Sequence, residues 1–190
     1  MPTLDRPDSH AAGIPRYTDV AIALHWIIAL AIIANIGFAL LTEDLPRASR
    51  MQYMDWHKAL GLTILVLSVV RLIWRLMHRP PPLPAESPAW QNKAAHALHW
   101  LFYVLMIGIP IGGWLIVSTG KTPGPIDWFG FFNIPALPTG PNPGLHETAE
   151  GMHETLGLAM IPLILLHVGA ALKHQFIDRD NLFARMRPVP

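Results

Sequence analysis

The sequence contains no cysteine, and this absence excludes several kinds of site at once. Without thiols the chain can form no disulfide, no thiolate-bound metal site, no iron–sulfur cluster and no haem attached through a C-x-x-C-H motif. Any haem would have to be held by histidine or methionine side chains. A redox cofactor in this protein is therefore expected to bind without a covalent tether.

Charged residues are also scarce, at 14% of the 190 residues, whereas a soluble domain has about 25%. Hydrophobic residues make up 52% of the chain and gather in long uncharged runs. The net charge of +1 gives no reason to expect a nucleic-acid partner. We therefore predict an integral membrane protein, embedded in a lipid bilayer as a single membrane domain over residues 1–190.

Four segments are long and apolar enough to span a hydrocarbon layer of about 30 Å. They are placed at about residues 20–41, 52–78, 89–118 and 146–176. Residues 119–145 form a long loop with six prolines and a cluster of aromatic residues, which favours a position at the membrane interface. The predicted fold is an all-α, up-down-up-down bundle of four transmembrane helices.

Lysine and arginine residues divide unevenly between the two ends of this bundle. Ten lie at the end that holds both termini, and four lie at the opposite end. The positive-inside rule then predicts that both termini are cytoplasmic and that the 119–145 loop is external. In a Gram-negative bacterium the chain would be a multi-pass protein of the inner (plasma) membrane.

Ten histidines are many for a membrane chain, and four of them fall at two matched depths. His153 and His167 are 14 residues apart in the last helix, which puts them on one face and about 21 Å apart along the axis. With the predicted topology, His25 lies at the depth of His167 and His57 at the depth of His153. Two histidine pairs at two depths of a bundle are typical of two six-coordinate b haems.

Other interpretations compete with this pairing. A lone histidine in a membrane helix is more often a packing residue than a ligand, and a zinc site would need four ligands at one depth rather than two. His96 and His99 also lie at the inner depth and are alternatives to His25 or His167 as ligands. Three of the four remaining histidines are assigned to the N-terminal tail, the interface and the outer rim: His10, His78 and His146.

Several short motifs, taken in their order and spacing, resemble the prokaryotic cytochrome b-561 family. They are ALHW, WHKALG, VVRLIWRL, AHALHWLFY, MHETLG, LLHVGAALKH and DNLFARMRP. The resemblance covers residues 16–188 and extends to the cytochrome b subunits of nickel hydrogenases. It implies a four-helix, di-haem membrane cytochrome whose axial ligands, carried over, are His25, His57, His153 and His167.

The same family includes a membrane-bound superoxide oxidase that passes electrons to ubiquinone. The resemblance therefore implies electron transfer from an external one-electron donor, such as superoxide, to ubiquinone, and it places His174 at the quinone site. Arg71 and Arg75 are candidate partners for haem propionates or a quinone oxygen, with a role as interfacial anchors as the alternative. The 119–145 loop departs from the family's pattern, so the outer donor, a small anion or a protein, stays open.

Two further functions stay open at this point. One is a cytochrome b anchor subunit that docks a separate dehydrogenase or hydrogenase. The other is a transporter that uses the same helices around an empty or ion-filled core. A homo-oligomer is compatible with either.

Overall fold

The computed structural model describes residues 16–42, 44–82, 88–180 and 182–188, so His10 lies outside the described residues. Four long helices dominate this part of the chain: α1 (Asp19–Leu40), α2 (Arg47–Met77), α3 (Ala89–Thr119) and α4 (Pro143–Lys173). Each is long and apolar enough to cross a membrane. The prediction of an all-α, four-span membrane protein is confirmed.

The helices begin where the local chemistry favours a start. Thr18 caps α1, its Oγ1 accepting a hydrogen bond from the Ala21 N–H at 3.3 Å. Asn142 caps α4 in the same way, and Pro143 occupies the first helical position, where no N–H is needed. α2 starts at Arg47, directly after Pro46 and five residues before the expected position. Helix-compatible residues thus extend α2 and α4 into the loops at the end of the bundle away from the described termini. This end is called outer, and the opposite end inner, by the orientation that the charges predict.

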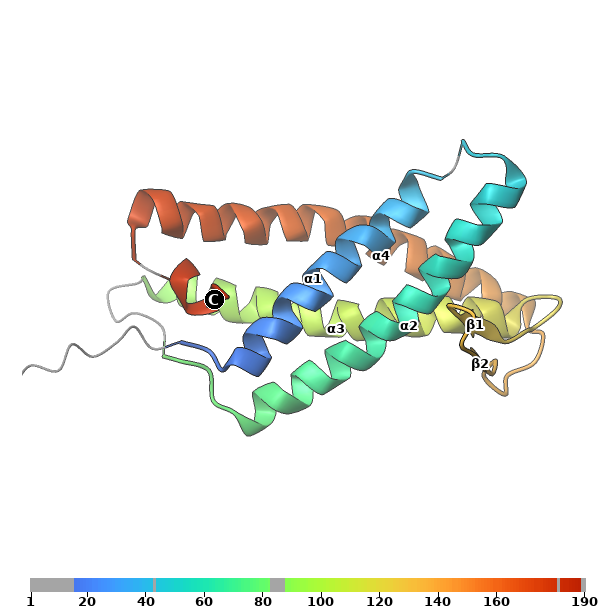
Figure 1. Cartoon of the computed structure of the whole chain (residues 1–190), viewed down its shortest axis with the longest axis horizontal. Helices are drawn as coiled ribbons and strands as arrows, with labels where there is room; N and C mark the ends of the chain where they lie inside the picture. The colour runs from blue at the N-terminus through green and yellow to red at the C-terminus, as the bar shows by residue number, and fades with distance from the viewer. Residues whose placement is uncertain (1–15, 43, 83–87, 181, 189–190) are drawn as a thin grey trace, which may run out of the picture.

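A small hairpin forms within the connection between α3 and α4, where only a loop was expected. Strands β1 (Ile126–Trp128) and β2 (Phe132–Ile134) pair antiparallel. The turn between them has two residues with positive φ, Phe129 and Gly130. The Trp128 indole N–H donates to Thr63 Oγ1 of α2 at 3.0 Å, so the hairpin is attached to the outer part of the bundle (Figure 1).

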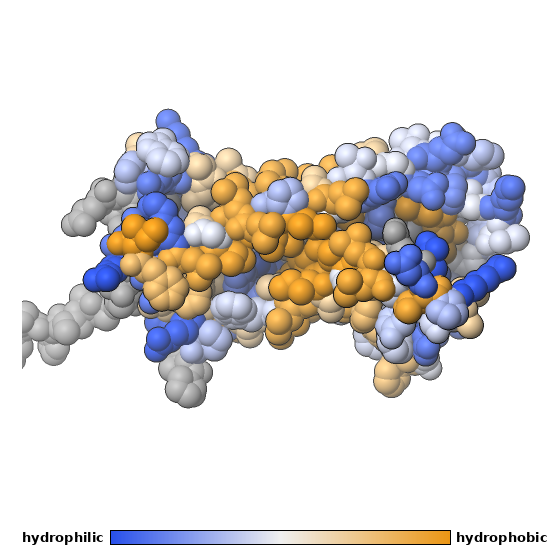
Figure 2. Space-filling model, turned by 90° about the horizontal axis from the view of Figure 1, so that it is seen from above, coloured by the Kyte–Doolittle hydropathy of each residue, from blue (hydrophilic) through white to orange (hydrophobic). Residues whose placement is uncertain are grey.

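Hydrophobic side chains lie inside the bundle and also over its outer surface. Buried residues of α1, α3 and α4 form the core cluster Ile28, Tyr103, Leu105, Met106 and Met160. Figure 2 shows hydrophobic residues across the middle of the molecule and hydrophilic residues towards its two ends. At most 22% of any spanning window is buried. An exposed apolar belt between polar ends is the surface that a bilayer covers.

The chain after α4 folds back against the beginning of α1. α4 continues into the π-helix η1 (His174–Asp178), and a short 3-10 helix, η2 (Phe183–Met186), follows. The Trp26 indole N–H donates to the Met186 carbonyl at 2.8 Å, and Arg185 Nη1 donates to the Pro82 carbonyl at 2.5 Å. We call residues 182–188 the C-terminal strap. It joins α1, the α2–α3 connection and α4 at the end opposite the hairpin (Figure 1).

Candidate haem sites and the surroundings of His174

The outer half of the bundle brings the rings of His57 of α2 and His153 of α4 together in a T-shaped arrangement. Their ring centroids are 5.9 Å apart and their ring planes are at 80°. In the inner half, His25 of α1 and His167 of α4 have centroids 6.2 Å apart and planes at 76°. The two pairs are those that depth matching selects from the sequence.

The spacing within each pair fits an iron atom between the rings. A metal–imidazole nitrogen bond is about 2.0–2.1 Å long, so two imidazoles on opposite sides of one metal have centroids about 6 Å apart. In each pair the two histidines belong to different helices. The positions of the ligands are therefore supported by rigid elements. The donor set is therefore suited to two b haems with bis-histidine ligation.

The outer pair is oriented by backbone carbonyls. His57 Nδ1 lies 3.1 Å from the Asn35 carbonyl, and His153 Nδ1 lies 2.9 Å from the Ile109 carbonyl. A carbonyl can only accept, so each Nδ1 carries the hydrogen and each Nε2 keeps a free lone pair. This is the arrangement that metal-binding histidines usually show.

A cavity of about 680 Å³ adjoins the outer pair, within the 300–1,000 Å³ range of cofactor sites. Its wall is mainly aliphatic and includes His57 and His153. Asn35 Oδ1 is buried there without a hydrogen-bond partner among the described residues. An apolar cavity with two inward imidazoles fits a porphyrin better than a free ion.

Gly113 of α3 leaves room for the His153 ring. A Cβ at this position would lie 3.0 Å from His153 Cε1 and 3.3 Å from its Nδ1. Such a contact is tighter than ordinary packing, so the ring would have to shift by a few tenths of an ångström. The glycine therefore lets α3 approach α4 closely while the imidazole keeps its contact with Ile109.

We expect Gly113→Ala to weaken the outer haem selectively. The added methyl group pushes the His153 ring away from its position, and disturbing a ligand's support typically costs on the order of tenfold in affinity. Haem per chain should fall after mild detergent washing, with the inner haem retained. Gly108→Ala is the matched control, because nothing lies within 4 Å of a Cβ there. Equal haem loss in both variants would contradict the role of Gly113.

The alternative inner ligands take different positions. His96 is exposed. The His99 ring lies inside, with its centroid 5.5 Å from that of His167. The 6.2 Å spacing of His25 and His167 is closer to the value for two rings on one iron. His25 is retained as the proposed ligand, and His99 is the residue against which this assignment has to be tested.

The other predicted residues also fall near the ends of the bundle. Arg71 and Arg75 each hold a guanidinium 5.8 Å from the ring centroid of Tyr103 in the inner half. His78 stacks on Trp74 with centroids 3.9 Å apart, and His146 Nδ1 lies 3.1 Å from the Ile116 carbonyl near the outer end.

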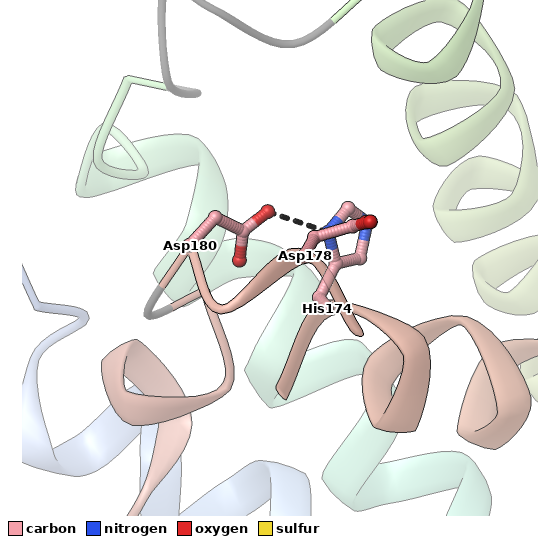
Figure 3. Close-up of side chains that lie close together, drawn as sticks. All are labelled: His174, Asp178 and Asp180. Carbon is pink, nitrogen blue, oxygen red and sulfur yellow. Dashed lines mark hydrogen bonds and ion pairs between the residues drawn. The ribbon is translucent and has the colours of Figure 1, made fainter. Parts of the chain in front are cut away.

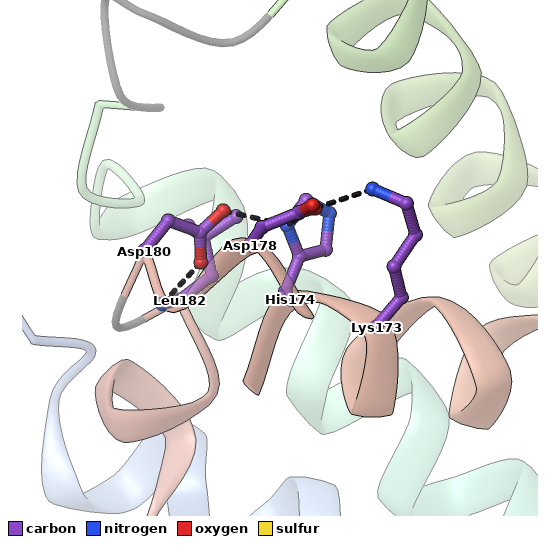
Figure 4. Close-up of polar contacts among 5 residues, drawn as sticks. All are labelled: Lys173, His174, Asp178, Asp180 and Leu182. Carbon is purple, nitrogen blue, oxygen red and sulfur yellow. Dashed lines mark hydrogen bonds and ion pairs between the residues drawn. The ribbon is translucent and has the colours of Figure 1, made fainter. Parts of the chain in front are cut away.

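His174 stands at the inner end among acidic residues that the sequence analysis did not single out. Its Nδ1 is 2.6 Å from Asp180 Oδ2 and 3.3 Å from Asp178 Oδ2, and Figure 3 shows both carboxylates beside the ring. Lys173 pairs with Asp178 at 2.5 Å, and the Leu182 N–H donates to Asp180 Oδ1 at 3.1 Å (Figure 4). The π-helix and the left-handed Arg179 (φ 53°) turn the chain so that Asp180 reaches the imidazole.

Comparison with known proteins agrees with this geometry. The model of the family described as prokaryotic cytochrome b561 matches residues 16–188. "Cytochrome b561 homolog 2" of Escherichia coli K12 is 34% identical over 176 residues, covering 90% of each chain. "Probable superoxide oxidase CybB" of Yersinia pestis is 31% identical over 177 residues, covering 91% of this chain and 96% of the relative. "Cytochrome b562" of Cereibacter sphaeroides is 28% identical over 178 residues, covering 90% of this chain and 95% of the relative.

These findings confirm the family expected from the sequence motifs. Four apolar spanning helices together with this family indicate a multi-pass bacterial membrane protein. Family membership also implies haem b and membrane electron transfer. The chain belongs to the prokaryotic cytochrome b561 family.

Proposed function

We propose that this protein is a di-haem b cytochrome that carries electrons from an external one-electron donor, superoxide in particular, to ubiquinone. It would act as a superoxide:ubiquinone oxidoreductase of the bacterial inner membrane, with both termini in the cytoplasm. The observation that carries the proposal is the pair of facing histidines at each of two depths, with centroids 5.9 and 6.2 Å apart. When bound, the haems supply the one-electron redox chemistry, and the protein positions and tunes them.

The four proposed axial ligands divide between the two haems. His57 and His153 would hold the outer haem, and His25 and His167 the inner one. Because His153 and His167 are 14 residues apart in α4, the ligand sites are separated by about 21 Å along the helix. The porphyrin edges would be closer than this, so the spacing is compatible with electron transfer across the membrane.

At the inner end, His174 would deliver protons to the quinone. With its Nδ1–H donating to Asp180 at 2.6 Å, a protonated His174 can give up the Nε2 proton and stay oriented. One ubiquinone takes up two electrons and two protons to become ubiquinol. Two superoxide anions supply the electrons and leave as dioxygen, and the protons come from the cytoplasm.

Arg71 and Arg75 would contribute positive charge near the inner haem. Both are partly buried and lie over the Tyr103 ring. Arginine presents several N–H donors in a fixed plane that suits carboxylates. We assign them to the propionates of the inner haem, or to a quinone oxygen.

The rim of the outer cavity carries charges of both signs. Arg50 and Lys58 line it on one side, and Glu150 and Glu154 line it on the other. Lys58 Nζ is also only 2.7 Å from Asp55 Oδ1. The cations nearest the cavity are thus partly offset, so steering of an anion towards the outer haem is expected to be modest.

Stopped-flow mixing with superoxide tests the proposal. We expect rapid reduction of the oxidised protein, followed by reoxidation when a ubiquinone analogue is present. The reduction rate should fall modestly as ionic strength rises, because salt screens the rim charges. Lys58→Gln should lower the rate, with Lys121→Gln, an exposed lysine in the same outer region, as the matched control. Slow reduction by superoxide, with fast reduction by another donor, would reject superoxide while keeping the quinone-linked role.

A further inference from the structure

A small cavity at the inner end of the bundle is lined by arginines from two directions. It has a volume of about 60 Å³ and lies between the beginning of α1 and the end of α2. Arg16 precedes α1, and the other three belong to α2 or follow it directly: Arg71, Arg75 and Arg79. Aromatic side chains complete much of the wall: Tyr17, Trp74, His78 and Tyr103.

The charges around this cavity are of one sign. Among the residues that the structure describes, neither an aspartate nor a glutamate contributes to the wall, and none of the four guanidiniums is in ion-pair contact with a carboxylate. Arg16 Nη2 donates instead to the Arg187 carbonyl at 2.8 Å. Four like charges around one cavity repel each other, and an anion bound between them would relieve that repulsion.

The size of the cavity limits what the anion can be. About 60 Å³ is roughly twice the volume that a water molecule takes up in the liquid. This space accepts a phosphate or carboxylate group but not a porphyrin or a quinone ring. Trp74, whose indole N–H donates to Thr18 Oγ1 at 2.8 Å, and Tyr17 are residue types that gather at the level of lipid headgroups.

The surface next to the cavity favours a lipid over a free ion. Arg16 and Arg79 are exposed, so the cavity is accessible from the headgroup region. The apolar residues Ile73, Leu76 and Met77 on α2 are 51%, 67% and 72% exposed, and acyl chains can lie along them. Basic pockets between transmembrane helices are known to recognise anionic headgroups.

We propose that this cavity binds the phosphate of an anionic phospholipid in the leaflet on the side of the two termini. A headgroup that carries its own ammonium group would place a cation beside four arginines and is therefore disfavoured. The site contains none of the four proposed histidine ligands, but it shares Arg71 and Arg75 with the contacts proposed above for the inner haem or the quinone. The proposal depends on the membrane position of the protein and not on its electron donor or acceptor.

Native mass spectrometry of the haem-loaded protein from mixed phosphatidylglycerol and phosphatidylcholine nanodiscs tests it. We expect one phosphatidylglycerol to be retained preferentially. The double variant Arg16→Gln/Arg79→Gln should reduce this retention on the order of tenfold, because each surface cation contributes measurably to anionic-lipid binding. Lys93→Gln, an exposed lysine near the start of α3 that does not line the cavity, removes a charge and should have no effect.

Three results would overturn the proposal. The first is equal retention of both lipids, or retention that the double variant leaves unchanged. The second is binding of inorganic phosphate at this cavity with no retained phosphatidylglycerol, which would identify a free anion as the occupant. The third is loss of inner-haem absorbance in the double variant, which would assign these two arginines to a haem propionate.

Discussion

His57→Ala or His153→Ala is expected to lower the haem content from two b haems per chain to one. Each substitution removes one of the two imidazoles whose centroids are 5.9 Å apart, and one imidazole cannot give six-coordinate ligation. The pyridine haemochrome assay with protein quantification measures the change, and low-temperature absorption shows which α-band is lost.

The inner variants provide the complementary result. His25→Ala and His167→Ala should each remove the inner haem and leave the outer band in place. His99→Ala is the matched control, because its ring lies 5.5 Å from the same His167 without being assigned as a ligand. If His99→Ala removes a haem and His25→Ala does not, the inner pair is His99 with His167. One haem or none in the wild-type protein would reject the di-haem proposal, and a colourless protein would favour a transporter.

His174→Ala should slow quinone-dependent reoxidation on the order of a hundredfold, the usual size of a general acid's contribution. Both haem spectra should remain, because His174 is seven residues beyond His167 and its Nδ1 contacts Asp180 rather than another imidazole. Stopped-flow mixing of the reduced protein with a ubiquinone analogue gives the rate.

Two variants separate proton delivery from a general effect on the helix end. Asp180→Asn replaces the carboxylate but keeps an amide oxygen that can accept the Nδ1–H of the imidazole, so it should slow the reaction less than His174→Ala. Gln175→Ala changes an exposed neighbour and should leave the rate unchanged. Loss of a haem in His174→Ala would mean that His174 is a ligand and that the inner site lies one heptad further along α4.

The histidine pairs could be anticipated because their positions follow from regular helix geometry and from the order of the four spans. A separation of 14 residues in α4 fixes both the shared face and the spacing of His153 and His167, and the run of four spans supplies the depth of His25 and His57. The orienting carbonyls of Asn35 and Ile109 could not be anticipated. Every residue has a backbone carbonyl, and only the packing of helices decides which one meets a ring.

The hairpin and the acidic neighbours of His174 were missed for a related reason. Proline-rich residues 119–145 give no alternating pattern from which strands could be predicted, and β1 and β2 have three residues each. Asp180 reaches His174 only because a π-helix is followed by a left-handed Arg179. A regular helix would put positions 174 and 180 on different faces, so spacing alone argues against that contact.

The C-terminal strap also has a consequence for how the protein matures. Trp26 and Pro82 are in contact with Met186 and Arg185, which follow them in the chain by 160 and 103 residues. Chains emerge from the amino end first, so this end of the bundle stays without these contacts until residues 185 and 186 have been synthesised. The proposed inner haem would thus have an interval for insertion while α4 is already present and the strap has not yet tied the helices together.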